Sequence, residues 1–114
     1  MIDPPLRYRL EDIRDYAREA VDARDADLVP SERLRELALE RLISIVGEAA
    51  SKVPPEVRAL APEIDWPKVV GMRHVLVHDY SMIKKDVVID VVTHRLPSLI
   101  LAIERLLAEG KQDT

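Results

Sequence analysis

The residues best suited to chemistry lie in one short stretch, residues 73–80, which reads Arg-His-Val-Leu-Val-His-Asp-Tyr. Four of its side chains can move a proton or hold a phosphate: Arg73, His78, Asp79 and Tyr80. A histidine titrates near neutral pH and can act as a general acid or a general base. An arginine presents a fixed, bidentate cation to a phosphate. The stretch is therefore a candidate site for proton transfer at a phosphate group.

The same stretch lies in the positively charged part of the chain. The whole sequence has 17 basic and 21 acidic side chains, so its formal net charge is −4. Residues 65–85 hold two acids and four bases, which gives this segment a charge of +2. A net negative charge argues against a general nucleic-acid coat protein, because such binding depends on neutralising phosphates. The segment that contains the candidate site is thus the one with a net positive charge.

Helix geometry bears on whether these side chains can meet. On one ideal helix, positions 73 and 80 share nearly the same face, whereas positions 73 and 78 are about 140° apart. Arg73 and His78 can converge if the helix ends near His78, or if two copies of the segment meet across a dimer axis. The alternative is structural, since these side chains could instead cap the last carbonyl groups of a helix. Composition and spacing leave both interpretations open.

The histidines offer little evidence for a metal. His74 and His78 are four residues apart and would share a helix face, which is half of a metal site. No glutamate lies between them and no third ligand has suitable spacing, so we expect no metal and no cofactor. The absence of cysteine also excludes disulfides and a cysteine nucleophile. We expect His94 to be an ordinary surface or interface histidine.

Apolar residues recur every three or four positions along four stretches, as they do on one face of a helix. The predicted helices cover about residues 6–23, 32–52, 66–77 and 86–107. Asp3, Ser31, Asp65 and Asp86 are candidate helix starts. A short helical turn is expected within the proline-rich connection 53–65, and a loop is expected at 79–85. The predicted apolar face of the second helix comprises Leu34, Ala38, Leu42, Ile45, Val46 and Ala49, widened by Leu37 and Leu39.

The last predicted helix has three features of its own. Pro97 lies in its interior, removes one backbone hydrogen bond and is expected to kink the helix. Gly110 is the expected C-terminal stop. The helix is also apolar on more than one face, which is more than we expect a bundle of this size to bury. A second copy of the chain is therefore expected to cover part of it.

Length and composition limit the possible architectures. The 114 residues fit one domain, residues 1–114, with a core of about 6–108. Four main helices with short connections predict an all-α, up-and-down bundle. No apolar run reaches the ~18 residues of a membrane span. The N-terminal segment lacks the features of a signal peptide, so we expect a cytoplasmic protein with no membrane partner.

The chain resembles the HEPN superfamily, and in particular its HepT branch of minimal prokaryotic proteins. The signature of that branch is an Arg, four residues, a His, one residue and a Tyr, which Arg73, His78 and Tyr80 match in full. His74 departs from the pattern, because a small polar residue often follows the arginine. Further similarities lie at Trp66-Pro67, Gly71-Met72, Leu96-Pro97, Glu40-Arg41 and residues 45–49.

This resemblance implies a HEPN-type bundle that forms a homodimer, with the two Arg/His motifs facing each other in a cleft. It implies the toxin component of a toxin–antitoxin module, a metal-independent endoribonuclease that cleaves RNA with Arg73 and His78. His74 and Asp79 would be supporting residues of that site. The implied partner is an MntA-like nucleotidyltransferase antitoxin, which neutralises the toxin by transferring AMP to Tyr80 (AMPylation).

An alternative function shares the same fold. Some HEPN proteins have lost nuclease activity and serve as non-catalytic partners or substrate-binding subunits of a nucleotidyltransferase. The two interpretations differ in whether His78 does chemistry.

Overall fold

The computed structural model describes residues 2–25, 32–77 and 90–112. These residues form helices α1 (Pro4–Asp25), α2 (Glu32–Ser51), α3 (Pro55–Arg58) and α4 (Trp66–Val77), followed by a π-helical turn η1 (Val91–Arg95) and helix α6 (Leu96–Gln112). No strand occurs within these three ranges. The predicted all-α bundle of four main helices and one short helical turn is confirmed.

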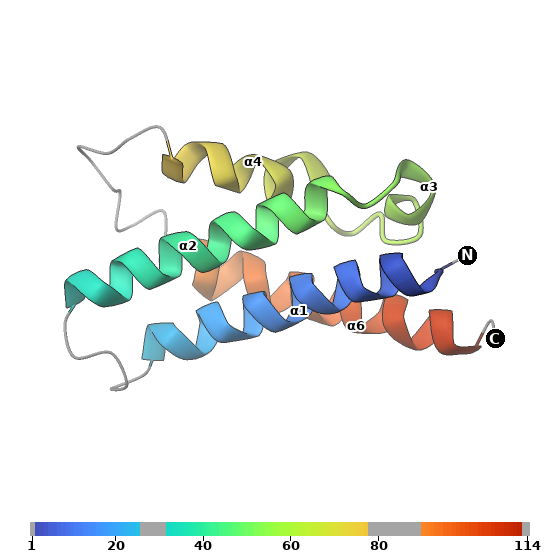
Figure 1. Cartoon of the computed structure of the whole chain (residues 1–114), viewed down its shortest axis with the longest axis horizontal. Helices are drawn as coiled ribbons and strands as arrows, with labels where there is room; N and C mark the ends of the chain where they lie inside the picture. Colours follow the sequence, from blue (N-terminus) through green and yellow to red (C-terminus); the bar gives the residue numbers. More distant parts are fainter. Residues whose placement is uncertain (1, 26–31, 78–89, 113–114) are drawn as a thin grey trace.

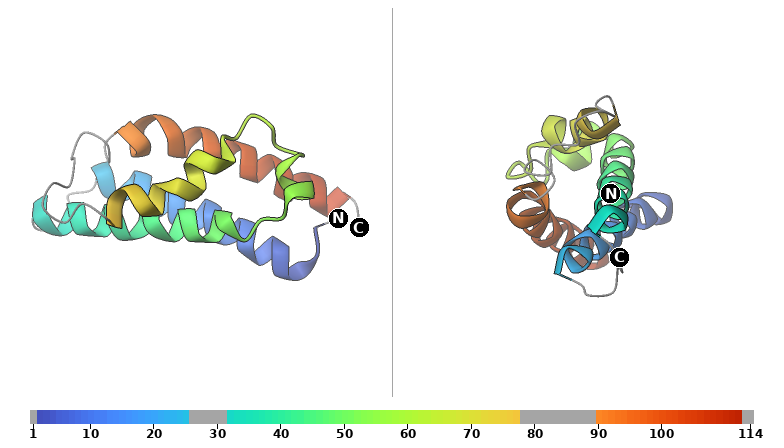
Figure 2. Two further views of the ribbon diagram at one scale, coloured as in Figure 1. Left: turned by 90° about the horizontal axis from the view of Figure 1, so that it is seen from above. Right: turned by 90° about the vertical axis from the view of Figure 1, so that its left-hand side faces the viewer.

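The main helices run alternately up and down the long axis of the bundle (Figure 1). α1 packs against α2 and α6, and α2 packs against α1 and α4. The packing order is therefore α4, α2, α1, α6, with α4 and α6 at its two ends. Figure 2 shows this arrangement from above and along the bundle. In the described residues α4 and α6 make no extensive contact with each other, so one side of the bundle is more open than the others.

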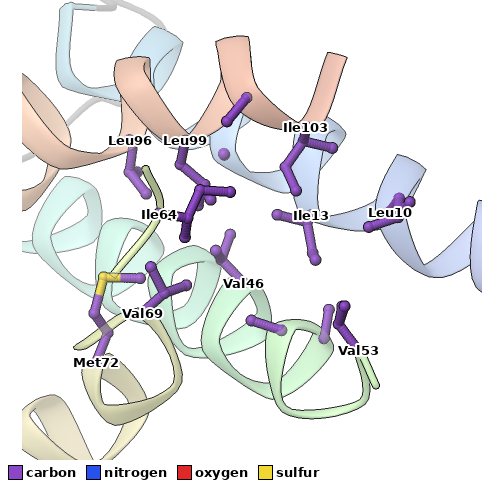
Figure 3. Close-up of a cluster of buried hydrophobic side chains, with 14 of the residues drawn as sticks. Leu10, Ile13, Val46, Val53, Ile64, Val69, Met72, Leu96, Leu99 and Ile103 are labelled. Atoms are coloured by element: carbon purple, nitrogen blue, oxygen red, sulfur yellow. The ribbon is translucent and has the colours of Figure 1, made fainter. Parts of the chain in front are cut away.

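The core is made of apolar side chains from every main helix, and no described residue with a polar or charged side chain is buried. Figure 3 shows its centre, where α1 and α6 meet α2 and α4. The largest fully buried side chains include Leu10, Ile13, Ile43, Val46, Leu96 and Ile103. Burying one such side chain contributes about 1.5–3 kcal/mol. Hydrophobic burial is therefore the main stabilising term of this bundle.

The buried face of α2 is rotated from the predicted one. Leu34 and Leu37 are 49% and 42% exposed, and Leu42 and Ile45 are only half-buried. The residues that α2 contributes to the core are Leu39, Ile43, Val46, Ala49 and Ala50. The physical reason is that α2 packs between α1 and α4, so its buried face is set by two neighbours rather than by its widest apolar stripe.

One tryptophan joins the end of α2 to the beginning of α4. The Nε1–H group of Trp66 donates to the carbonyl oxygens of Arg58 at 3.1 Å and of Ala61 at 3.2 Å. The guanidinium carbon of Arg58 lies 5.7 Å from the centre of the tryptophan ring, which is a cation–π geometry. Arg58 also donates to the carbonyl oxygens of Val53 at 2.9 Å and Ala50 at 3.4 Å, after the last turn of α2. Trp66 and Arg58 therefore fix where α4 starts.

Two of the predicted helix starts are confirmed by their hydrogen bonds. The Asp3 Oδ1 atom accepts from the Leu6 N–H at 2.9 Å, and the Asp65 Oδ1 atom accepts from the Lys68 N–H at 3.2 Å. Each carboxylate caps a donor of the first helical turn that has no partner inside the helix. Ser31, Asp86 and the predicted loop 79–85 lie outside the described residues.

The predicted irregularity at Pro97 takes the form of a π turn. The Leu96 N–H donates to the Val91 carbonyl oxygen, five residues earlier, directly before the proline. In a regular helix the proline ring would clash with the carbonyl group four residues earlier, and a wider turn relieves that clash. The prediction for Gly110 is wrong, because α6 continues to Gln112. No described glycine adopts the positive φ angle that would end a helix.

The surplus apolar surface on the described part of the last helix is smaller than expected, and Val87 and Val88 lie outside the described residues. One chain alone buries Val91, Val92, Leu96, Leu99, Ala102, Ile103, Leu106 and Leu107. This is possible because α1 packs along one side of α6, while Ile64 and Val69 lie toward Leu99 on the other (Figure 3). Leu101 is the large apolar residue that stays exposed on α6, at 69%. The described part of the last helix therefore gives little separate support for a dimer.

We predict that Trp66→Phe lowers the free energy of unfolding by about 1 kcal/mol. The ring is kept, and the two carbonyl groups that lose the indole donor each keep a backbone donor. Trp66→Ala should cost about 3–5 kcal/mol, because it also leaves a cavity. Urea unfolding followed by circular dichroism measures both values. Tyr8→Ala, at an aromatic residue that is 67% exposed, is the control and should stay within about 0.5 kcal/mol of the unsubstituted protein.

Candidate functional site

The predicted site residues begin on α4. Arg73 and His74 lie in its second half, two turns after Trp66, and the structure describes their backbone. His78, Asp79 and Tyr80 follow the last described residue of α4, Val77, and lie outside the described residues. The grouping of Arg73 with His78 and Tyr80 therefore stays a prediction. What the structure does define is the helix that carries Arg73.

That helix is firmly held at its beginning and along one face. Trp66, Val69 and Met72 are 5%, 2% and 4% exposed, and α4 packs with this face against α2. Position 73 follows Met72 directly and lies one turn after Val69, next to this buried face. The backbone at Arg73 is therefore positioned by core packing and by the hydrogen bonds of Trp66. This fixed backbone position suits a residue that is expected to bind a phosphate.

The other side of α4 is open in the described residues. Pro67 and Lys68 are exposed, and Gly71 is half-buried. A Cβ atom placed on Gly71 would meet no other atom within 4 Å. Glycine inside a helix costs about 1 kcal/mol relative to alanine. Nothing in the described part of this chain therefore requires a glycine at this position, which shares a helix face with position 74.

A cavity of about 500 Å³ opens where α4 and α6 do not pack on each other. Its floor is apolar and consists of Ile64, Val69 and Leu99, which are 8%, 2% and 2% exposed. Figure 3 shows these three side chains close together between the two helices. Polar side chains surround the floor and come from both sides, namely Glu63, Asp65, Asp90, His94 and Arg95. The cavity therefore combines an apolar floor with charged walls.

One arginine of α6 holds a wall of this cavity in place. Arg105 donates to the carbonyl oxygen of Leu60 at 3.0 Å, to the Glu63 carboxylate, and to the Glu109 carboxylate at 2.9 Å. The hydrogen bond from Arg105 lowers the pKa of Glu63 below its usual value. The same contact raises the pKa of Arg105. Arg105 thus fastens the connection before α4 onto α6, on the side of the bundle where these two helices do not pack together.

The charged groups of the cavity fall into two sets. Glu63 is paired with Arg105, and Asp65 caps α4 and lies 3.8 Å from the Lys68 Nζ atom. The side chains of Asp90, His94 and Arg95 make no hydrogen bond or ion pair with any residue in the described ranges. Asp90, His94 and Arg95 are therefore available to a ligand, whereas Glu63 and Asp65 hold the walls of the cavity.

The sequence did not predict this cavity. It did predict that His94 is a surface residue, and the structure finds that side chain exposed. His94 and Arg95 end the π turn, whose irregular geometry directs the side chains differently from a regular helix. The available signal was Pro97, because π turns are frequent at functional sites. The position of Asp65 and Glu63 opposite that turn depends on tertiary packing and had no signal in the sequence.

The part of the chain that the structure describes contains no group of three or more histidine, cysteine or acidic side chains that could hold a metal ion. The His74–His78 pair is not tested by this finding, because His78 lies outside that part. None of the described helices is both long enough and apolar enough to span a membrane.

Comparison with known families identifies the chain. A family model described as "Ribonuclease HepT-like" matches residues 8–106, which include most of α1, all of α2 and α4, and most of α6. The chain therefore belongs to the HepT-like ribonuclease family. This confirms the resemblance predicted from Arg73, His78, Tyr80 and the residues around them.

Curated relatives agree with this assignment. "Probable ribonuclease HepT" of Thermococcus cleftensis is 34% identical over 71 residues, which are 62% of this chain and 64% of the relative. "Putative RNase TTE0752" of Caldanaerobacter subterraneus is 27% identical over 74 residues, 65% of this chain and 66% of the relative. "Putative RNase MJ0127" of Methanocaldococcus jannaschii is 25% identical over 108 residues, 91% of this chain and 88% of the relative. The first two alignments thus span slightly less than two thirds of each relative, and no solved structure matches the chain.

Proposed function

We propose that this protein is an endoribonuclease that cleaves RNA without a metal ion, with Arg73 and His78 as its catalytic residues. The observation that carries the proposal is the family match over residues 8–106, which spans the whole Arg73–His78–Tyr80 motif. The names of the relatives, which describe RNases, support it. The support that α4 gives to Arg73 is consistent with a residue that must present a fixed cation to a phosphate.

The reaction needs only the groups that the motif provides. A neutral His78 imidazole takes the proton of a ribose 2′-hydroxyl, and the 2′-oxygen forms a bond to the adjacent phosphorus. The bond from phosphorus to the 5′-oxygen breaks, and that oxygen takes a proton from a second, protonated imidazole. Arg73 stabilises the negative charge that develops on the phosphoryl oxygens. The products are a 2′,3′-cyclic phosphate and a 5′-hydroxyl.

Two imidazoles with different protonation states are required, and one chain supplies only one His78. A homodimer with its motifs face to face would supply the second, and it would also bring together Arg73 and His78, which are about 140° apart on one ideal helix. The open face of α4 around Gly71 is the surface we assign to this contact, since no described residue of the same chain needs a glycine there.

We predict that Arg73→Ala and His78→Ala each abolish RNA cleavage and growth inhibition while the helical content is unchanged. EDTA should leave the activity of the unsubstituted protein unaffected, because no step uses a metal. A fluorescent RNA assay with purified protein measures cleavage, and circular dichroism checks the fold. Arg9→Ala, at an exposed arginine of α1, is the matched control and should remain active.

Loss of activity with EDTA, or continued cleavage by both variants, would contradict this mechanism. An unsubstituted protein that binds a nucleotidyltransferase and cuts no RNA would instead favour the alternative function, a non-catalytic partner subunit.

We predict that Gly71→Ala stabilises the isolated chain and weakens the dimer. The added methyl group favours the helix by up to about 1 kcal/mol and meets nothing in the described part of its own chain. In the dimer it would separate the two helices that must approach each other. Light scattering should give twice the chain mass of 13.0 kDa for the unsubstituted protein and a larger monomer fraction for the variant. A monomeric unsubstituted protein, or an unaffected dimer of the variant, would contradict this contact.

We further propose that the protein is the toxin of a toxin–antitoxin module in the cytoplasm, and that an MntA-like nucleotidyltransferase antitoxin controls it through Tyr80. The Tyr80 phenolic oxygen would attack the α-phosphorus of ATP held by the partner. Pyrophosphate leaves, the phenolic proton passes to a base of the partner or to water, and AMP stays on the tyrosine. The attached phosphate would then bind Arg73 in place of the RNA backbone.

We predict that co-expression with the neighbouring nucleotidyltransferase adds one AMP to Tyr80 and that Tyr80→Phe prevents the addition. The chain has an internal control, because Tyr8 is 67% exposed and would also react if exposure alone decided the site. Peptide mass spectrometry locates the modification. A fully neutralised toxin with an unmodified Tyr80 would show that the antitoxin acts by binding alone.

A further inference from the structure

We infer that the cavity between α4 and η1–α6 takes up one base of the RNA substrate and favours bases that carry an exocyclic amino group. This inference rests on the proposed ribonuclease function and names what that site recognises. It assigns a role to Asp90, His94 and Arg95, three side chains that the cleavage mechanism does not use.

Size and floor suit a nucleobase. The cavity measures about 500 Å³, which lies within the range of about 300–1,000 Å³ found for small-molecule sites. Its floor of Ile64, Val69 and Leu99 is apolar and nearly fully buried. A flat aromatic ring can rest on the small part of this floor that stays exposed, because its faces have no hydrogen-bonding groups.

The walls of the cavity can form hydrogen bonds with the edge of the base and can stack on the face that points away from the floor. Carboxylates accept hydrogen bonds from exocyclic amino groups, as Asp and Glu do from the N4 amino group of cytosine. Asp90 has no partner among the described residues and can do so, whereas Asp65 is tied to α4 and Glu63 to Arg105. Guanidinium and imidazole planes stack on bases, and Arg95 and His94 line the cavity with no partner in the described residues.

The charge of the cavity argues for a base rather than a phosphate. Three carboxylates line it, against one arginine and one histidine. A phosphate would be repelled by Asp65 and Asp90, while an uncharged ring with N–H donors would be attracted. The backbone of the RNA would then run outside the cavity.

The location of the cavity relative to Arg73 also suits a site that binds a base of the RNA substrate. Val69 forms part of the floor and lies one helical turn before position 73 on the same face of α4. Four residues correspond to about 6 Å along the helix axis. A base held over Val69 would therefore belong to a nucleotide at or next to the phosphate that Arg73 binds.

The test is to titrate the isotope-labelled protein with nucleosides and to follow the methyl resonances of Ile64, Val69 and Leu99. Cytidine and uridine are a matched pair, because cytidine has an amino group where uridine has a carbonyl oxygen. We expect cytidine to shift these methyl resonances and to bind at least several-fold more tightly than uridine. Asp90→Asn should weaken cytidine binding by about tenfold, which corresponds to the worth of one good base contact.

Two further variants separate a specific site from a surface effect. Ser98→Phe fills the mouth of the cavity from an exposed position and should abolish the shifts. Asp12→Asn removes an exposed carboxylate of α1 and should bind cytidine normally. The inference is overturned if no nucleoside shifts the floor methyl groups, or if cytidine and uridine bind equally. It is also overturned if a short arginine peptide binds there and nucleosides do not, because the cavity would then be a protein-docking site.

Nucleoside binding involves no cleavage, so the result does not depend on activity. A protein that cuts RNA and fails to bind cytidine refutes the base site and leaves the proposed function intact. A protein that binds cytidine and cuts no RNA refutes the proposed function instead.

Discussion

The two hydrogen bonds of the Trp66 indole decide where the helix of the candidate site begins. They hold the short α3 segment, and Arg58 above the ring reaches back to the carbonyl groups at the end of α2. Asp65 then caps the first turn of α4. Because the start of α4 is fixed in this way, every later position on the helix, including Arg73, has a defined height and direction along the bundle. Packing of Val69 and Met72 against the core maintains that direction.

The same arrangement leaves one side of the bundle open. α4 packs on α2, α6 packs on α1, and a π turn before Pro97 widens the beginning of the last helix. Arg105 bridges part of the gap between them, because it binds the connection before α4 from α6. An apolar floor results from this geometry, with polar groups around it of which three have no partner in the described residues. A cavity of about 500 Å³ beside a candidate catalytic helix is a place to look for substrate recognition.

Local chemistry made much of this fold predictable. The helix caps at Asp3 and Asp65 could be predicted from the sequence, because an aspartate directly before a helical pattern commonly caps the helix. Pro97 likewise predicted an irregular turn, because a proline inside a helix removes one backbone hydrogen bond. Features that depend on how the helices pack together could not be predicted from the sequence. The buried face of α2 is set by two neighbouring helices, and the apolar stripe of its sequence predicted a face that is rotated from the observed one. The cavity joins residues that are about thirty positions apart and had no sequence pattern of its own.

In the mechanism we propose, RNA itself supplies the nucleophile, through its 2′-hydroxyl group. The most direct measurement uses two otherwise identical RNAs, one of which has a single 2′-deoxy nucleotide at the cleavage site, in a buffer that contains EDTA. We predict that the unmodified RNA is cut to a 2′,3′-cyclic phosphate and a 5′-hydroxyl, and that the deoxy substitution blocks the cut at that site. Cleavage at the deoxy position, or products with 5′-phosphate ends, would contradict the account.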